Sequence, residues 1–170
     1  MRDRPNDIIV QSDGWAEFHG RRYRCAVGRS GLAADKKEGD GATPVGCFAL
    51  RRLYYRPDRL DRPPTVLETV ALQPDDGWSD DPDKPDYNTL VKLPHGGSHE
   101  KMWREDNLYD LVVAIGHNDD PPEPGKGSAV FIHVARPDYS ATDACVAFSL
   151  DDLLEMLSEC GRETRICVQI

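Results

Sequence analysis

Prolines and glycines recur along almost the whole chain and leave few uninterrupted stretches for long helices. The 170 residues include 13 prolines and 14 glycines. Proline disrupts the helix interior and glycine favours turns, so this pattern excludes a long-helix architecture and favours a turn-rich β protein. Hydrophobic residues make up 39% of the chain, which is enough for a packed core. The length predicts one domain over residues 1–170.

Short apolar or alternating runs between the turns predict strands. Ile8–Val10 is apolar, and residues 16–27 alternate around Gly20 in the manner of a hairpin. Further strands are expected at 47–55, 66–72, 108–115, 129–134 and 164–170.

One segment has a helical pattern. Ser149 is a suitable N-cap, and leucines follow at helical spacing up to Leu157, with Gly161 at the expected C-terminus. The chain is therefore predicted to be mainly β, without the regular strand–helix alternation of a parallel α/β fold.

Charge and hydropathy restrict the partners. The formal net charge of −9 argues against nucleic acid, whose phosphates require clustered Lys and Arg. No apolar run approaches the ~20 residues that span a bilayer, so no membrane span is expected. No apolar segment resembling an export signal follows the N-terminus.

The sequence contains no clear motif for a metal site or for a disulfide framework. Five cysteines without a C-x-x-C pair predict neither a disulfide framework nor a Cys-rich zinc site, and the four besides Cys145 are expected to be buried structural thiols. The acidic segment 75–85 lacks the EF-hand spacing and is interpreted as a solvated loop. The segment 93–103, with His95 and His99, lacks the H-E-x-x-H order, and is either a surface loop or a cap over a cleft. No metal site is predicted.

Cys145 and His133 are the first candidates for chemistry. Cys145 lies between a polar loop and an apolar step towards the predicted helix, and His133 ends a predicted central strand. A cysteine becomes a nucleophile when a neighbouring base takes its proton, and a neutral imidazole is the usual base. From spacing alone, a packing cysteine and a core histidine remain the simpler alternatives.

Four segments in order resemble a known family: Gly-Asp-Gly-Ala-Thr-Pro-Val-Gly (39–46), Ile-Gly-His-Asn (115–118), Ala-Val-Phe-Ile-His-Val (129–134) and Ala-Thr-Asp-Ala-Cys-Val-Ala (141–147). Together they are similar to the catalytic domain of the YkuD-type L,D-transpeptidases, cysteine enzymes of peptidoglycan. The resemblance runs roughly from Val27 to Leu157. It implies a YkuD-like β-sandwich with one or two short helices.

The resemblance also implies roles for individual residues. Cys145 matches the nucleophile and His133 the base, while Thr142, Asp143 and Ala144 match the loop that shapes the oxyanion site. Asp143 and Ala144 stand where the family usually has His and Gly. These two departures affect the prediction of the substrate more than the assignment of the Cys/His pair.

Three further residues are candidates for substrate binding. His117 and Asn118 follow a predicted central strand, and either face the same cleft or form a polar loop. Arg136 either binds a carboxylate of an anionic stem peptide or is an exposed strand-end residue.

The implied activity is cross-linking of peptidoglycan stem peptides, 3→3 or 1→3, by a monomeric enzyme without a metal or organic cofactor. Acylation of Cys145 by β-lactams such as carbapenems, and a location in the periplasm or cell envelope, follow from the same resemblance. Two alternatives stay open: an L,D-carboxypeptidase or peptidase that trims stem peptides, and a non-catalytic peptidoglycan-binding module.

Overall fold

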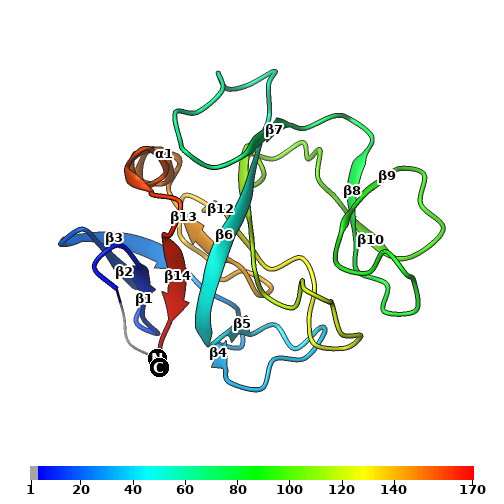
Figure 1. Ribbon diagram of the computed structural model, residues 1–170, viewed down its shortest axis with the longest axis horizontal. Helices are drawn as coiled ribbons and strands as arrows, with labels where there is room; N and C mark the ends of the chain where they lie inside the picture. The colour runs from blue at the N-terminus through cyan, green and yellow to red at the C-terminus, as the bar shows by residue number, and fades with distance from the viewer. Residues whose placement is uncertain (1–3) are drawn as a thin grey trace.

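The computed structural model of the protein describes residues 4–170. Residues 1–3, with which the predicted single domain and the N-terminal segment begin, lie outside the described residues. Strands connected by loops dominate the described part (Figure 1). The strands are β1 (Ile8–Val10), β2 (Trp15–Phe18), β3 (Arg21–Ala26), β4 (Leu32–Ala33), β5 (Thr43–Pro44), β6 (Gly46–Tyr55), β7 (Thr69–Ala71), β8 (Asp76–Ser79), β9 (Leu90–Lys92), β10 (His99–Lys101), β11 (Leu111–Ile115), β12 (Phe131–Val134), β13 (Val146–Phe148) and β14 (Arg165–Val168).

The main sheet has nine strands in the order β11-β12-β13-β3-β2-β1-β14-β6-β7. It closes on itself because β11 also pairs with β6, so the two halves of the expected sandwich are continuous. Most neighbours are antiparallel, and three pairs are parallel: β12–β13, β1–β14 and β6–β7. The prediction of a mainly β, YkuD-like fold is confirmed.

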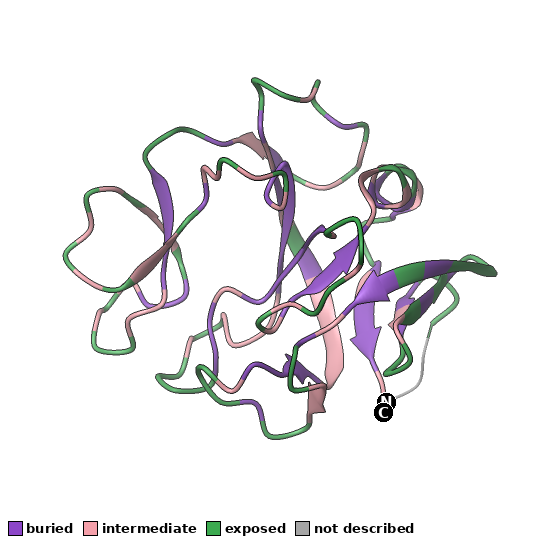
Figure 2. Ribbon diagram, turned by 180° about the vertical axis from the view of Figure 1, so that it is seen from behind, coloured by how far each residue is buried: buried purple, intermediate pink, exposed green. Residues whose placement is uncertain are grey.

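Side-chain alternation along the strands separates two hydrophobic clusters. In β11, Leu111 and Val113 face the larger core inside the closed sheet, whereas Val112 and Ala114 face a second cluster outside it. Figure 2 shows the buried strands at the centre of the molecule and the exposed residues mainly on peripheral loops. Cys145 belongs to the second cluster, so the candidate nucleophile lies on the outer face of the closed sheet.

The helix α1 (Leu150–Glu159) confirms the helical prediction. The Ser149 hydroxyl accepts a hydrogen bond from the backbone N–H of Asp152 at 3.2 Å and so caps the first turn. The helix ends at Glu159 with Cys160 as its C-cap, so Gly161 follows directly after the cap, as expected. Within residues 4–170, no helix combines the length and the apolar character that crossing a membrane requires.

A separate three-stranded sheet, in the order β10-β8-β9, lies to one side of the main sheet (Figure 1). The prediction of a solvated acidic loop at 75–85 is wrong for its first half, because Asp76–Ser79 form the buried strand β8. The Asp76 carboxylate is compensated there by the Gln73 N–H at 2.8 Å and the Lys92 ammonium at 2.6 Å.

The prediction that Cys47 and Cys167 are free thiols is also wrong. They occupy directly opposed positions on β6 and β14, with their Cα atoms 3.9 Å apart, and form a disulfide. Cross-strand register, which cysteine spacing in the sequence does not reveal, decides this pairing. Cys25, Cys145 and Cys160 are free and buried.

Candidate active site

A cavity of about 440 Å³ opens on the outer face of the main sheet, next to the three-stranded sheet. Its walls come from β10, β12, the segment 36–41 and the loop 140–145. Of the residues predicted from the sequence, it brings together Cys145, His133, Arg136 and the loop residues Thr142, Asp143 and Ala144.

Two threonine hydroxyls fix the backbone of Cys145 immediately before β13. The Thr142 and Thr43 hydroxyls both donate to the Cys145 carbonyl, at 2.7 and 3.3 Å. The Thr43 oxygen in turn accepts the Gly28 N–H at 2.8 Å. Gly28 leaves the space for this approach, since a Cβ there would lie 2.4 Å from the Gly41 carbonyl oxygen. The Gly-x-x-x-Thr-Pro segment therefore holds the backbone of Cys145 in place through the Thr43 hydroxyl.

The Cys145 thiol is enclosed and makes two hydrogen bonds. Its Sγ accepts the Phe131 N–H at 3.3 Å and donates to the Ala129 carbonyl at 3.4 Å. Ala129 has a positive φ of 51°, an uncommon conformation for a residue with a side chain. Burial, followed by the nearby negative charge of Glu100, raises the pKa of the Cys145 thiol to about 12. The Cys145 thiol is therefore protonated at neutral pH.

His133 is buried on β12, on the same face as Phe131. Its Nδ1 lies 2.9 Å from the Val134 carbonyl oxygen. A carbonyl only accepts hydrogen bonds, so Nδ1 carries the proton and Nε2 of the neutral ring keeps a free lone pair. Burial, with smaller contributions from Arg104 and Arg136, lowers the pKa of His133 to about 4. The imidazole is therefore neutral near pH 7 and able to accept a proton.

Strand register explains why these two side chains share the cavity. In the parallel pair β12–β13, Ile132 lies opposite Val146 and His133 opposite Ala147. The next position back pairs Phe131 with Cys145, so Cys145 and His133 lie on one face, two positions apart along the strands. A thiol and a neutral base meet the first structural requirement of cysteine acyl-transfer chemistry.

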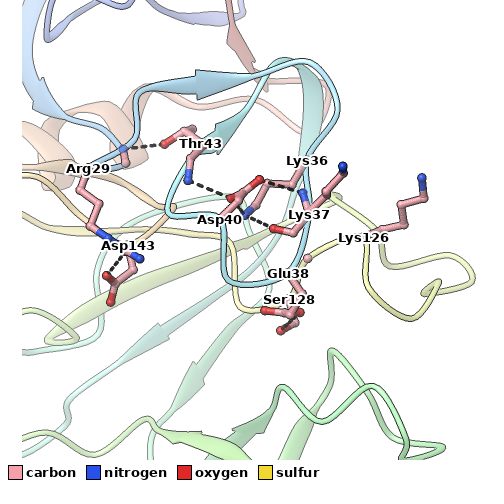
Figure 3. A network of polar contacts seen from close by, with 12 residues as sticks. Arg29, Lys36, Lys37, Glu38, Asp40, Thr43, Lys126, Ser128 and Asp143 are labelled. Atoms are coloured by element: carbon pink, nitrogen blue, oxygen red, sulfur yellow. Dashed lines mark hydrogen bonds and ion pairs between the residues drawn. The ribbon is translucent and has the colours of Figure 1, made fainter.

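The loop before Cys145 is attached to the segment that follows β3. The Thr142 N–H donates to the Val27 carbonyl, and the Arg29 N–H donates to the Thr142 carbonyl. At the exposed edge, the Arg29 guanidinium donates to Asp143 at 2.5 Å (Figure 3). Asp143, which replaces the histidine of the family pattern, is thus an exposed ion-pair partner rather than a buried orienting group.

His117 and Asn118 do not line this cavity. His117 lines a second cavity of about 520 Å³, and its Nε2 donates to the Lys126 carbonyl at 2.9 Å. Asn118, with φ of 49°, holds its loop closed through hydrogen bonds to Glu123 and Gly127. The hydrogen bonds of the two side chains stay within their own loop, as the polar-loop interpretation expects, and substrate binding by His117 and Asn118 stays a prediction.

Sequence reasoning did not identify several cavity residues. Figure 3 shows the segment 36–40, where the Lys36 ammonium contacts Asp40 and the Glu38 carboxylate accepts from the Ser128 hydroxyl at 2.8 Å. The walls also contain Asp80, Glu100, Arg104 and Tyr109. These side chains reach the cavity from distant segments, and the only sequence signal among them was the alternative that residues 93–103 cap a cleft.

Potential metal ligands gather elsewhere. Within residues 4–170, one group of His, Cys, Asp or Glu side chains lies close enough to hold an ion: Asp7, Cys47 and Cys167. Its two sulfurs are joined in the disulfide, and Asp7 pairs with Arg165 at 2.5 Å, so these atoms already have partners.

Fold and cavity together define a mainly β protein with a buried cysteine–histidine pair in a polar pocket. Residues 9–170 match the YkuD family, described as the L,D-transpeptidase catalytic domain, so the chain belongs to this family.

Among solved structures, the chain is similar to the helical cell shape determining protein Pgp2 from Campylobacter jejuni, at 16% identity and a TM-score of 0.38. The match covers 96% of this chain and 46% of the Pgp2 chain, so this chain spans about half the length of that structure. The comparison with curated proteins found no match.

Proposed function

We propose that this protein is a cysteine L,D-transpeptidase that cross-links peptidoglycan stem peptides, with Cys145 as nucleophile and His133 as general base and acid. The observation that carries the proposal is the shared cavity: a buried thiol and a neutral imidazole with a free Nε2 line it together in a YkuD-family chain. The link is 3→3 if the third residue of the donor is acylated and 1→3 if the first is.

In the acylation step, the Cys145 sulfur attacks the carbonyl of an L-configured centre linked to a D-amino acid. The thiol proton passes to His133 Nε2 as the C–S bond forms. Collapse of the tetrahedral intermediate breaks the C–N bond, and the proton leaves with the D-amino acid. The product is a thioester on Cys145.

In the second step, an acceptor amine attacks the thioester and gives its proton to His133. The new C–N bond forms, the C–S bond breaks, and His133 returns the proton to the Cys145 sulfur. One imidazole serves both half-reactions, and neither step requires a metal or organic cofactor.

The loop of Thr142, Asp143 and Ala144, with the backbone N–H of Cys145, is the proposed oxyanion site. Backbone donors are effective there when their orientation is fixed before the reaction. Support comes from the two hydroxyls that hold the Cys145 carbonyl and thereby fix the peptide geometry around the nucleophile.

Arg136 is the proposed contact for a substrate carboxylate. It lines the cavity, and among the described residues it forms no ion pair. The other cavity guanidiniums are occupied: Arg29 pairs with Asp143, and Arg104 binds Asp106 through two hydrogen bonds of 2.8 and 2.6 Å. We also propose that the protein acts in the cell envelope, and that carbapenems acylate Cys145.

Two alternatives use the same cavity in a different way. If water rather than an amine reaches the thioester, the same residues perform L,D-carboxypeptidase trimming. The raised pKa of Cys145 and the replaced Asp143–Ala144 pair instead favour a stem-peptide-binding module without catalysis.

Mass spectrometry of muropeptides incubated with the wild type, Cys145→Ala and Cys160→Ala separates the three. Cys160 is a matched control because it is also free and buried but lies outside the cavity. A cross-linked dimer from the wild type and Cys160→Ala, absent with Cys145→Ala, supports transpeptidation, and its fragmentation distinguishes 3→3 from 1→3. Trimmed monomer without dimer supports the carboxypeptidase, and unchanged muropeptides that still bind support the binding module.

A further inference from the structure

Two carboxylates in the cavity each have an oxygen without a partner. Glu100 Oε2 and Asp80 Oδ1 are both fully buried, and neither makes a hydrogen bond to any described residue. Both residues line the cavity that contains Cys145 and His133.

The three-stranded sheet places these carboxylates on one face. In the antiparallel pair β10–β8, Glu100 lies opposite Trp78. Asp80 lies two residues beyond Trp78, and the Asp80 N–H donates to the Ser98 carbonyl at 3.2 Å, which continues the pairing. Because strand side chains alternate, Trp78, Asp80 and Glu100 point to the same side. Trp78 packs there against Phe131 of β12, so this side faces the Cys145 region.

Among the described residues, no Lys or Arg forms an ion pair with Glu100 or Asp80, although the charge of Arg104 favours the ionised form of Glu100. Arg104 is held by Asp106, with its guanidinium over the Tyr109 ring at 5.1 Å. Lys36 contacts Asp40 and donates to the Lys37 carbonyl at 2.8 Å.

Glu100 interacts through a hydrogen bond with Tyr109, whose ring packs against His133 with centroids 5.4 Å apart. This contact ties Glu100 to the catalytic face and leaves Oε2 unsatisfied. Burial of a carboxylate oxygen without a hydrogen-bond partner costs desolvation free energy. A ligand that donates hydrogen bonds and carries positive charge would offset this cost. The position of the oxygen next to the Cys145 thiol indicates that the ligand is part of the substrate.

We propose that Glu100 and Asp80 form an ammonium subsite that binds a primary amine of the stem-peptide substrate beside Cys145. This rests on the proposed function, and it adds a substrate feature that the Cys/His pair alone does not specify. A primary ammonium supplies three donors on a compact charge, enough for both open carboxylate oxygens.

Occupation of this subsite also affects the nucleophile. The Glu100 charge opposes ionisation of Cys145, since two neighbouring negative charges repel. A bound ammonium cancels that charge, so the correct substrate makes the thiol easier to deprotonate.

The test is calorimetric binding of two peptides to Cys145→Ala protein. One is a stem tetrapeptide with lysine at its third position, and the other is the same peptide acetylated on the lysine Nζ. We expect acetylation to weaken binding roughly tenfold or more, as loss of a charged hydrogen bond does. Glu100→Gln, added to Cys145→Ala, is expected to weaken binding of the lysine peptide by a similar factor and to leave the acetylated peptide unaffected.

The control variant is Glu105→Gln, because Glu105 is an exposed acid outside the cavity. It should leave both affinities unchanged. Equal binding of the two peptides, an unchanged ratio in Glu100→Gln, or no binding of either peptide would overturn the subsite.

Acylation of wild-type protein by the lysine peptide, measured by intact mass, tests the proposed function separately. Acylation without amine selectivity in binding keeps the function and rejects the subsite. Amine-selective binding without acylation keeps the subsite and rejects the transpeptidase.

Discussion

Replacement of Glu100 by glutamine should stabilise the protein at alkaline pH. Burial raises the pKa of Glu100 from 4.5 to about 7, against the opposing effects of the Tyr109 hydrogen bond and the Arg104 charge, and with the charges of Asp80 and Asp143 acting in the same direction as burial. A difference of that size corresponds to at most about 3 kcal/mol of stability. The folded state binds the proton more tightly than the unfolded state, so the penalty is absent below pH 4.5. It grows between pH 4.5 and 7 and is complete above pH 7.

Urea denaturation of wild type and Glu100→Gln at pH 4 and pH 8 measures this effect. The variant should gain up to about 3 kcal/mol over the wild type between the two pH values. Glutamine keeps the side-chain shape, and the contribution of His133 titration is common to both proteins. The exposed Glu105→Gln control should show no such gain. A stability difference between Glu100→Gln and wild type that does not change with pH would refute the claim that burial opposes ionisation of Glu100.

Three further predictions concern the supports of the site and fold. Thr43→Val removes one of the two hydroxyls that hold the Cys145 carbonyl and leaves the Gly28 N–H without its acceptor, and should cost about 1–3 kcal/mol in urea denaturation. Reduction of the Cys47–Cys167 disulfide, which spans 120 residues of sequence, should lower stability by about 2–5 kcal/mol, seen as a drop in Tm with dithiothreitol. Ser149→Ala removes the N-cap of α1 and should cost about 1 kcal/mol, measured by thermal denaturation.

Local patterns predicted the elements whose stability is decided locally. The hairpin β2–β3 follows from alternation around Gly20, and the helix begins where the Ser149 cap and the leucine spacing placed it. The buried strands β11 and β12 were recognisable from their β-branched, apolar sequences. These signals depend on residues close together in the chain.

The missed features depend on long-range pairing. Strand β8 begins with an acid, Asp76, whose burial depends on its contacts with Lys92 and the backbone N–H of Gln73. Strand β13 has three residues, too few to give a period, and the opposition of Cys47 and Cys167 is set by register. Glu100 reaches the cavity through the same three-stranded sheet, so its place beside Cys145 could not be derived from spacing.

The most direct test of the central claim is intact-mass spectrometry of the protein after brief exposure to a stem tetrapeptide. We predict an adduct equal to the peptide without its terminal D-amino acid, located on Cys145 by peptide mapping and absent in Cys145→Ala. Release of the free D-amino acid should match the adduct in amount. A protein that binds the tetrapeptide but forms no adduct, or carries it at another residue, would contradict the assignment of Cys145 as the nucleophile.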